Sequence, residues 1–593
     1  MCGIVGFLGD KIQAKFLVEK LKKLEYRGYD SAGIANLEYG KFDVCKAVGK
    51  IANLEEQISD DFEINCAIAH TRWATHGKPS KDNAHPHVSV DKSWAVVHNG
   101  IIENYLDIKN QLNRKEEIKS ETDTAVVAEL LAQSNVKSVH DFISVCKQLV
   151  GSFALACLNS KLNNKIFLAR RKSPLYVAFK NGQSLIASDP ICFCNFSDEY
   201  FVMNNDEFAV VETDGVCFFN QKGEKIEKFT TKLDEIFEES GKGEYPHFML
   251  KEIQEEKSGL RRIVKSYTDN NVLNKFDKEF LEKYDAVEFI ACGTAYHAGL
   301  MGARYIEKCV KIKSYATIAS EFIYMNPIIN PKTLYVFVSQ SGETADTLRA
   351  MELVKAQNCA TIAVTNVLYS TLAKSVDFVL PVCAGPEIAV ASTKAYVCQL
   401  AVLYMFARHI QNKLQNENVD YLSDIKIVEE NIFNFDDSCL EEIADELKNQ
   451  TNSIYIGKDL DYITATEGCL KLKEIAYIFA SSYPSGELKH GFLALIEEGT
   501  IMFVLANSKE INTKTYNAGH EAVSRGARAV LIGGNEDAEI LKPTWHIKMP
   551  NINELLLPMI SVVPLQKIAY LVSVKKGINP DQPRNLAKSV TVE

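Results

Sequence analysis

The pattern of hydrophobic and polar residues differs between the two parts of the chain. Over residues 1–240, short apolar runs such as 94–97 and 153–156 are separated by turn residues, and helical patterns cover 12–24 and 124–133. Short apolar runs bounded by turns are typical of antiparallel strands. We therefore predict an α+β domain with layered, mostly antiparallel sheets over 1–240.

From residue 284 onward, the pattern becomes a buried strand, a turn rich in glycine or threonine, and then a helix. This series occurs twice. The strands predicted from it are 287–291, 334–338 and 361–365, and then 453–457, 501–506 and 529–533. Buried strands that alternate with helices predict doubly wound parallel sheets. We expect two similar α/β lobes with little sequence identity between them.

The domain boundaries follow from these patterns. The expected order is a domain at 1–240, a linker or hinge at 241–283, lobes at 284–430 and 431–575, and a C-terminal tail at 576–593. The short segment Gly241-Lys242-Gly243-Glu244-Tyr245-Pro246 has the glycine and proline content of a linker.

Composition narrows the class of protein. The 593 residues carry a net charge of −11, and 46% of them are hydrophobic. The chain lacks the basic stripe that a nucleic acid would need and any apolar run of the ~18 residues that span a bilayer. Its 15 cysteines include no CxxC pair. We therefore expect a reduced cytoplasmic protein without a zinc site, a nucleic-acid partner or a membrane contact.

Candidate chemistry begins at the N-terminus. Cys2 follows the initiator Met1, and removal of Met1 would place a thiol and a free α-amine on one residue. An α-amine titrates near pH ~8 and can take up the thiol proton, so Cys2 would carry both a nucleophile and a base. The alternative is an incidental cysteine at the start of a buried strand.

Polar motifs at strand and helix ends favour the catalytic interpretation. They are 2–6 (CGIVG), 26–33 (YRGYDSAG), 70–77 (HTRWATHG), 98–100 (HNG) and 120–124 (SETDT). Each has an ordinary interpretation, since Asn99-Gly100 is a common turn pair and Asp123 can be a first-turn helix acid. Taken together and in this order, the motifs resemble the glutaminase domain of N-terminal-nucleophile amidotransferases.

This resemblance implies a role for each matching residue. It implies that Cys2 is the nucleophile and that Asn99 and Gly100 are the oxyanion donors. The glutamine-binding residues that it implies are Arg72, Trp73, Thr75, His76 and Asp123. Trp73 would also be the gate of an ammonia channel. The residue types suit this chemistry, because a guanidinium pairs with the glutamine carboxylate and a carboxylate pairs with its ammonium. The tetrahedral oxyanion needs neutral donors, which Asn99 and Gly100 would supply.

A phosphate site is predicted where the strand at 334–338 ends. Ser339, Gln340, Ser341 and Thr344 place hydroxyls and an amide beside the N–H groups of a helix N-terminus. Such a turn suits a phosphate monoester dianion, and an elaborate helix cap is the alternative. The equivalent turn of the second lobe, 507–509, is plain, so we expect one phosphate site per chain.

Three charged residues share one helix face in the second lobe. Glu467, Lys471 and Glu474 lie at positions i, i+4 and i+7. A carboxylate with a nearby lysine suits proton transfer at a sugar carbon, provided that burial tunes the pKa of the carboxylate. A solvated stripe of surface ion pairs is the alternative.

The segment 339–344 resembles the sugar-isomerase domain family. Two tandem copies after a glutaminase domain are similar to the arrangement in glutamine–fructose-6-phosphate aminotransferases, and this resemblance covers essentially the whole chain. The sugar-phosphate-binding residues that it implies are Cys292, Gly293, Thr294, Ser339, Gln340, Ser341, Thr344, Ala391, Ser392, Glu467 and Lys471. Ala295 stands where some members have serine, and 254–257 departs from the family's hinge sequence.

The same resemblance implies the catalytic residues of the sugar site. Glu474 would move a proton between C1 and C2, and His490, supplied by the other subunit of a homodimer, would open the sugar ring. Lys588, in the tail, would form a Schiff base with the ketose carbonyl. Since this imine acts as the electron sink, no metal or organic cofactor is implied.

The predicted reaction converts L-glutamine and D-fructose 6-phosphate to L-glutamate and D-glucosamine 6-phosphate, with ammonia passed internally between the two sites. The alternatives are a non-catalytic sugar-phosphate sensor and another glutamine amidotransferase. An amidophosphoribosyltransferase would need a run of acidic residues before a Gly/Thr phosphoribosyl loop. An asparagine synthetase would need a Ser-Gly-Gly-x-Asp-Ser nucleotide loop. The chain contains neither motif.

Overall fold

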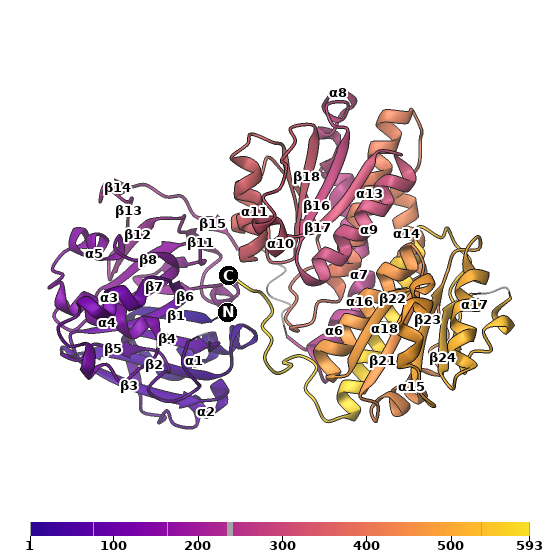
Figure 1. Cartoon of the computed structure of the whole chain (residues 1–593). Coiled ribbons are helices and arrows are strands. Elements are labelled where there is room, and N and C mark those ends of the chain that lie inside the picture. Colours follow the sequence, from indigo (N-terminus) through magenta and orange to yellow (C-terminus); the bar gives the residue numbers. More distant parts are fainter. Residues whose placement is uncertain (1, 75, 163, 234–240, 535–536, 592–593) are drawn as a thin grey trace. The chain divides into compact units, whose positions relative to one another are not determined.

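The structure is a computed structural model of the 593-residue chain. It describes every residue except 1, 75, 163, 234–240, 535–536 and 592–593. The chain forms two compact units (Figure 1). The first unit comprises Met1–Ser240 together with Ala587–Glu593, and the second comprises Gly241–Leu586. Each unit buries a hydrophobic core of its own.

The first unit is built on two antiparallel sheets, as predicted. Its strands are β1 (Gly3–Gln13), β2 (Ser31–Glu38), β3 (Lys41–Val48), β4 (Glu63–Arg72), β5 (His87–Val88), β6 (Trp94–Ile102), β7 (Gly151–Asn159), β8 (Ile166–Arg171), β9 (Tyr176–Lys180), β10 (Gln183–Ala187), β11 (Glu199–Val202), β12 (Glu207–Glu212), β13 (Gly215–Phe219), β14 (Lys225–Ile226) and β15 (Thr231–Lys232). One sheet has the order β15-β11-β9-β10-β1-β4-β2-β3, and the other β14-β13-β12-β8-β7-β6-β5.

Helices cover the outer faces of these sheets. They are α1 (Ala14–Lys22), α2 (Ile51–Glu55), α3 (Tyr105–Gln111), α4 (Asp123–Gln133) and α5 (Val139–Cys146), with short 3₁₀ turns η1 (Glu25–Arg27), η2 (Lys115–Glu117) and η3 (Pro190–Phe193). The helix predicted at 124–133 is α4, which begins one residue earlier. Its N-cap Thr122 accepts a hydrogen bond from the backbone N–H of Ala125 (3.3 Å), which is why the chain turns into a helix there.

Alternation along the strands explains the layers. On β1, Ile4 and Leu8 lie in the core between the sheets, whereas Phe7 faces α1, where its ring centroid is 5.8 Å from that of Phe16. On β7, Phe153 packs into the cluster that α4 and α5 share with their sheet. Since successive side chains of a strand point to opposite faces, each sheet buries both faces, one on the other sheet and one under helices.

The second unit contains two parallel sheets. The strands of the first lobe are β16 (Ala286–Ala291), β17 (Lys313–Ile318), β18 (Thr333–Ser339), β19 (Thr361–Thr365) and β20 (Phe378–Pro381), and those of the second are β21 (Asn452–Gly457), β22 (Phe479–Pro484), β23 (Ile501–Ala506), β24 (Arg528–Gly533) and β25 (Trp545–Ile547). The orders β17-β16-β18-β19-β20 and β22-β21-β23-β24-β25 are the same arrangement. Two similar doubly wound lobes were predicted, and the strand orders match that prediction.

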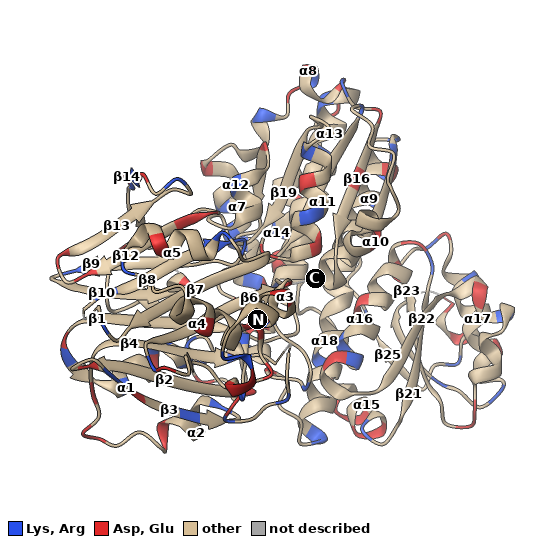
Figure 2. Ribbon diagram, turned by 60° about the vertical axis from the view of Figure 1, so that its left-hand side comes forward, with Lys and Arg blue, Asp and Glu red and all other residues tan. Residues whose placement is uncertain are grey.

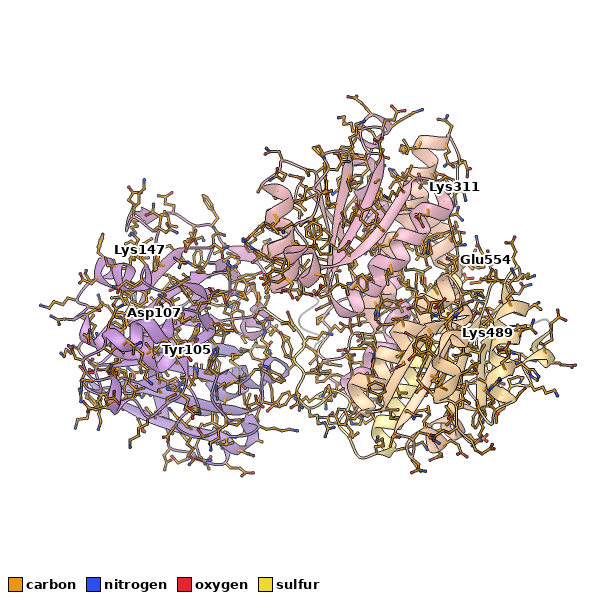
Figure 3. The ribbon with its side chains drawn as sticks, viewed as in Figure 1. Tyr105, Asp107, Lys147, Lys311, Lys489 and Glu554 are labelled. Carbon is orange, nitrogen blue, oxygen red and sulfur yellow. The ribbon has the colours of Figure 1, made fainter. Side chains whose placement is uncertain are left out.

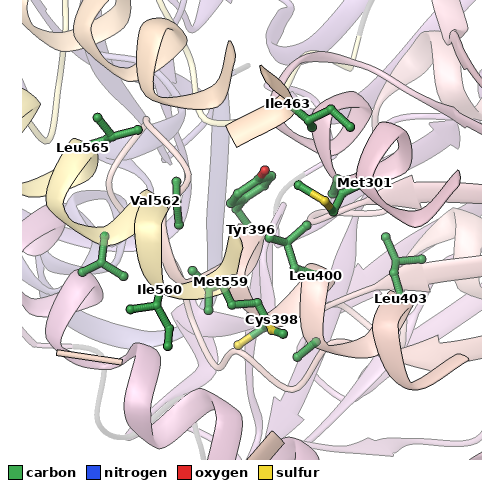
Figure 4. Close-up of a cluster of buried hydrophobic side chains, with 14 of the residues drawn as sticks. Met301, Tyr396, Cys398, Leu400, Leu403, Ile463, Met559, Ile560, Val562 and Leu565 are labelled. Atoms are coloured by element: carbon green, nitrogen blue, oxygen red, sulfur yellow. The ribbon is translucent and has the colours of Figure 1, made fainter. Parts of the chain in front are cut away.

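Long helices join the two lobes of this unit. The helices are α6 (Phe248–Gln254), α7 (Glu256–Asp269), α8 (Lys278–Leu281), α9 (Gly293–Cys309), α10 (Ala319–Tyr324), α11 (Ala345–Lys355), α12 (Thr371–Ser375), α13 (Lys394–Gln415), α14 (Tyr421–Asn431), α15 (Leu440–Leu447), α16 (Leu460–Ala476), α17 (Asn512–Val523) and α18 (Leu557–Lys575), with 3₁₀ turns η5 (Val272–Lys275), η6 (Ser485–His490), η7 (Phe492–Leu495) and η8 (Ala538–Ile540). Met301 of α9, Leu400 of α13, Ile463 of α16 and Met559 of α18 belong to one buried cluster (Figure 4).

Helix α16 lies deep in this cluster. A Cβ atom on Gly468 would lie 2.4 Å from Leu565 of α18, so glycine permits the two helices to approach closely. Helix α18 is long and apolar enough to cross a membrane, with a mean hydropathy of 1.5, although the sequence predicted no such segment. Because 83% of its apolar window is buried in the protein, α18 is a core helix of this unit.

Charged residues lie mainly on the helices and loops of both units, whereas the strands are mostly uncharged (Figure 2). In that view, Lys and Arg segments are interspersed with Asp and Glu segments.

Candidate active site

Cys2 precedes β1, next to the end of β4. The two strands pair with Gly3 opposite Thr71. The backbone N–H of Trp73 donates to the Cys2 Sγ atom (3.3 Å). Burial raises the pKa of the Cys2 thiol, and the Trp73 N–H and the Arg72 charge act in the opposite direction. Since the net pKa is raised, the thiol needs a nearby base before it can attack.

Asn99 and Gly100 lie on β6, in the other sheet. The Asn99 Nδ2 atom donates to the Cys2 carbonyl oxygen (3.0 Å). Gly100 has φ +128°, and a Cβ atom there would lie 2.0 Å from the carbonyl oxygen of Ser152, so only glycine fits. The stacked sheets thus bring the predicted oxyanion residue Asn99 to the predicted nucleophile.

Arg72 is buried but not fully paired. Its Nη2 atom donates to the carbonyl oxygens of His76 and Gly77, the latter at 3.1 Å. Its Nη1 atom is buried and has no hydrogen-bond partner among the described residues. Burial lowers the pKa of Arg72. A buried guanidinium with an unused N–H group is suited to bind a ligand carboxylate.

Asp123 is the first residue of α4 and is 5% exposed. Its carboxylate accepts hydrogen bonds from the backbone N–H groups of Ile102 (2.8 Å) and Thr124 (2.9 Å). Its charge influences the pKa values of both Cys2 and Arg72, so these three predicted residues lie in one neighbourhood.

Two further predicted residues border this neighbourhood. The Trp73 ring meets the edge of Tyr29, with centroids 5.8 Å apart. The ring of His76 packs at 5.5 Å against Tyr105, which is labelled in Figure 3. Thr75, also predicted to bind glutamine, lies outside the described residues.

The predicted sugar-phosphate residues of the first lobe lie at the carboxyl ends of adjacent strands. Ala291 of β16 is opposite Val338 of β18, so Cys292 and Ser339 leave the sheet side by side. Cys292 is the N-cap of α9, and Gly293 begins this helix with φ +55°. In a doubly wound sheet, this edge is where ligands bind.

Hydrogen bonds order the loop after β18. The Ser339 Oγ atom accepts from the N–H of Gly342 (3.0 Å) and lies 3.0 Å from the Thr344 Oγ1 atom. The Ser341 Oγ atom accepts from the N–H of Glu343 (3.2 Å). Thr344 is the N-cap of α11, yet its hydroxyl makes no capping hydrogen bond. The helix-cap alternative therefore does not account for the Thr344 hydroxyl.

The charged residues of α16 form a buried network. Glu467 and Lys471 are fully buried, with 3.3 Å between the Lys471 Nζ atom and the Glu467 carboxylate. Nζ also lies 2.7 Å from the Glu474 carboxylate and 3.0 Å from the Thr294 Oγ1 atom of the first lobe. Burial alone would lower the pKa of Lys471, but the two carboxylates outweigh it and raise this pKa. The surface-stripe alternative is therefore wrong.

His297 is a member of this network that the sequence analysis missed. Its Nδ1 atom lies 2.7 Å from the Glu467 carboxylate, which also accepts from the Thr294 hydroxyl (3.0 Å). Burial raises the pKa of Glu467, but Lys471, His297 and Thr294 outweigh it and lower this pKa. The only sequence signal is the i, i+3 spacing of Thr294 and His297, which places both on one face of α9.

Ser392 and Ala391 belong to the segment that precedes α13. The Ser392 Oγ atom donates to Glu387 (2.8 Å), whose carboxylate also accepts from the N–H groups of Thr393 (2.9 Å) and Ala395 (3.0 Å). One carboxylate thus fixes the turn that carries both predicted residues.

Comparison with known proteins shows which domains and which family the chain matches. The SIS domain family matches residues 280–408 and 446–576, and the Glutamine amidotransferase domain family matches 70–195. The chain is similar to three proteins named glutamine–fructose-6-phosphate aminotransferase (isomerizing), from Clostridium acetobutylicum (43% identical), Caldanaerobacter subterraneus (42%) and Bacillus subtilis (40%), and covers 100% of both sequences in each case. The chain belongs to the glutamine–fructose-6-phosphate aminotransferase family.

A solved structure within this family supports the fold of the second unit. The C-terminal domain of glucosamine-fructose-6-phosphate aminotransferase from Francisella tularensis is 33% identical and superposes with a TM-score of 0.54. The match covers 58% of this chain and 100% of that domain. The doubly wound lobes are therefore the fold that this part of the family adopts.

For two further residues, the catalytic role rests on the family resemblance alone. His490 is exposed at the end of η6, next to Lys489, which pairs with Glu521 at 2.6 Å (Figure 3). Lys588 is half-buried in the tail segment Ala587–Glu593, which belongs to the first unit, whereas Glu474 belongs to the second. The roles of His490 and Lys588 stay predictions.

Proposed function

We propose that the chain converts L-glutamine and D-fructose 6-phosphate to L-glutamate and D-glucosamine 6-phosphate, the first step of hexosamine synthesis. The observation that carries this proposal is the presence in one chain of two distinct sites. One is a cysteine beside an amide donor and a buried arginine, and the other is a buried lysine–glutamate network next to a hydroxyl-rich loop. Glutaminase chemistry needs the first site, and ketose–aldose chemistry needs the second.

In the glutaminase half-reaction, Arg72 holds the carboxylate of glutamine and Asp123 its ammonium. The α-amine of Cys2 takes the thiol proton, and the sulfur attacks the side-chain amide carbon. Asn99 and the Gly100 N–H stabilise the resulting oxyanion. Ammonia leaves, and water then hydrolyses the thioester to glutamate.

In the sugar half-reaction, Ser339, Gln340, Ser341 and Thr344 bind the phosphate through hydroxyl, amide and helix N–H donors. His490 opens the sugar ring, and the Lys588 amine forms an imine with the ketose carbonyl. Ammonia, passed internally from the first site, displaces the lysine. Glu474 then transfers a proton from C1 to C2, which gives the amino aldose.

We also propose that the chain works as a homodimer in the cytoplasm. The exposed position of His490 supports a dimer, because this residue is available to a second copy. The cytoplasm is supported by cysteines such as Cys66, Cys157 and Cys398, which are buried and form no disulfide.

The proposal is tested with a Cys2→Ala variant. We expect the wild type to form hexosamine phosphate from glutamine and fructose 6-phosphate. The Cys2→Ala variant should lose glutamine-dependent synthesis and keep sugar isomerisation, because the thiol serves only the first half-reaction. Cys45→Ala, at a partly exposed cysteine on β3, is the matched control and should keep both activities.

Loss of both activities in Cys2→Ala would contradict the division between sites. Sugar-phosphate binding without product in the wild type would favour the sensor.

Removal of Met1 is a condition of this mechanism, since a retained Met1 would acylate the base. The intact mass of the active enzyme should therefore lack Met1. An active preparation that retains Met1 would rule out the α-amine as the base.

A further inference from the structure

We propose that His70 is a positioning residue of the glutaminase reaction, which fixes the orientation of the Asn99 amide through a tautomer set by a neighbouring carbonyl. This inference rests on the role proposed above for Asn99 as an oxyanion donor. His70 itself does not contact the reacting atoms.

The hydrogen bonds of His70 define its tautomer. Its Nε2 atom lies 2.9 Å from the carbonyl oxygen of His98 and 3.1 Å from the Asn99 Oδ1 atom. A backbone carbonyl oxygen can only accept a hydrogen bond, so the Nε2 atom must carry the proton. The Nδ1 atom is buried without a hydrogen-bond partner among the described residues. His70 is fully buried, and burial lowers its pKa to about 3, so its ring is neutral at physiological pH.

This tautomer selects one orientation of the Asn99 amide. Since the Nε2–H group is a donor, the amide atom that faces it must be the acceptor Oδ1. The Nδ2 atom then points the other way, toward Cys2, where it donates to the carbonyl oxygen of that residue (3.0 Å). If the amide were rotated by 180°, two donors would meet at His70 and an oxygen would face the site of the developing negative charge. Asn99 is 6% exposed, so water offers little compensation for such a rotation.

Packing keeps the His70 ring in this position. The ring of His85 stacks on it, with centroids 4.1 Å apart and an interplanar angle of 15°. The Nδ1 atom of His85 accepts from the backbone N–H of His98 (3.4 Å), so this hydrogen bond of His85 goes to the backbone and not to the Asn99 amide. His85 therefore supplies a matched control: it shares the burial and packing of His70 but not its hydrogen bond to the amide.

The test measures glutaminase kinetics of the full-length protein after four substitutions. His70→Phe should lower kcat for glutamine hydrolysis by about 10- to 100-fold, which is less than the ~10²–10³ loss in rate when an oxyanion donor is removed outright. KM should stay within about threefold of the wild type, because Arg72 and Asp123 still hold the substrate. His70→Gln retains an N–H donor and should restore kcat to at least about tenfold above His70→Phe. His85→Phe keeps the stacked ring and should stay within about threefold of the wild type.

A double mutant separates this inference from the proposed site. In an Asn99→Ala background, His70→Phe should cause no further loss, since His70 acts through the amide. Independent, multiplying losses would overturn the inference, as would an unchanged kcat in His70→Phe or an equal loss in His85→Phe. If Asn99→Ala itself keeps wild-type kcat, the proposed oxyanion role fails instead. Sugar isomerisation and the melting temperature are measured for each variant, and a kcat loss in His70→Phe that His70→Gln does not rescue counts against the inference.

Discussion

In the first lobe of the second unit, β18 ends in Ser339, and the loop that follows carries hydroxyls that bond to one another. In the second lobe, the corresponding strand β23 ends in Ala506, followed by Asn507. The strand orders of the two lobes are identical. The helices that follow β16 and β21 also differ at their second residue, since α9 has Thr294 where α16 has Asp461.

This difference supports our proposal of a phosphate site in the first lobe. The Asp461 carboxylate accepts from the backbone N–H of Asn507 (2.8 Å) and from its Nδ2 atom (2.6 Å). In the second lobe, the chain's own carboxylate thus occupies donors at the strand end. The helix that has Asp461 as its second residue, α16, carries Glu467, Lys471 and Glu474. We therefore propose that one topology serves phosphate recognition in the first lobe and proton transfer in the second.

The largest expected effect is in the second lobe. Glu474→Gln removes the proposed base but keeps the shape of the side chain. We expect kcat for sugar isomerisation to fall by about 10²–10⁴, the range that general-base catalysis contributes. Glutaminase activity should persist, because Cys2 is unchanged. Glu446→Gln, which alters a surface ion pair with Arg528 (3.0 Å), is the control and should leave kcat for sugar isomerisation unchanged. Wild-type isomerisation in Glu474→Gln would assign the proton transfer to another group.

A smaller effect is expected in the first lobe. Ser339→Ala and Thr344→Val each remove a hydroxyl from the proposed phosphate loop. We expect KM for fructose 6-phosphate to rise by about 10- to 100-fold, since a hydrogen bond to a charged group contributes about 1.5–3 kcal/mol. Ser508→Ala removes a hydroxyl from the equivalent turn of the second lobe and should leave KM for fructose 6-phosphate unchanged. An equal rise in KM for Ser508→Ala would show that the lobes share phosphate binding.

The smallest expected effect is on stability and depends on pH. Burial raises the pKa of Asp461 from 3.8 to about 6. Because the folded state favours the protonated form, this contribution to stability is complete below about pH 4 and is lost as the pH rises through 6. The melting temperature of Asp461→Asn, relative to that of the wild type, should therefore rise as the pH is raised from 4 to 7.

Asp459→Asn is the control for this comparison, because Asp459 is partly exposed and pairs with Lys308 (2.7 Å). Its difference from the wild type should not change with pH in the same direction. A constant difference for Asp461→Asn would mean that the Asp461 carboxyl does not titrate in this range.

The sequence predicted those parts of the sites that local motifs encode. Cys2, Arg72 and Asp123 stand at strand or helix ends, where strand pairing brings residues together, whereas Asn99 lies within β6 and not at its end as predicted. The fold class was predicted from the change in the pattern of hydrophobic residues near residue 284. These predictions needed only short-range patterns and the rules of sheet topology.

Contacts between distant helices could not be predicted in the same way. Glu467 and His297 lie 170 residues apart and meet only because α9 and α16 pack together. The burial of Lys471 was also undetermined, since α16 is covered on several sides and shows no single apolar face. The hydrogen bond from His70 to Asn99 depends on the stacking of two sheets, which the pattern of either strand does not define.

The transfer of nitrogen from glutamine to the sugar is the central claim of this account. We would incubate the purified full-length protein with fructose 6-phosphate, glutamine labelled with ¹⁵N at the side-chain amide, and an excess of unlabelled ammonium chloride. The hexosamine phosphate would then be analysed by mass spectrometry. The account predicts a product that carries ¹⁵N, because ammonia passes internally from Cys2 to the sugar. A product with unlabelled nitrogen, or no hexosamine phosphate, would contradict it.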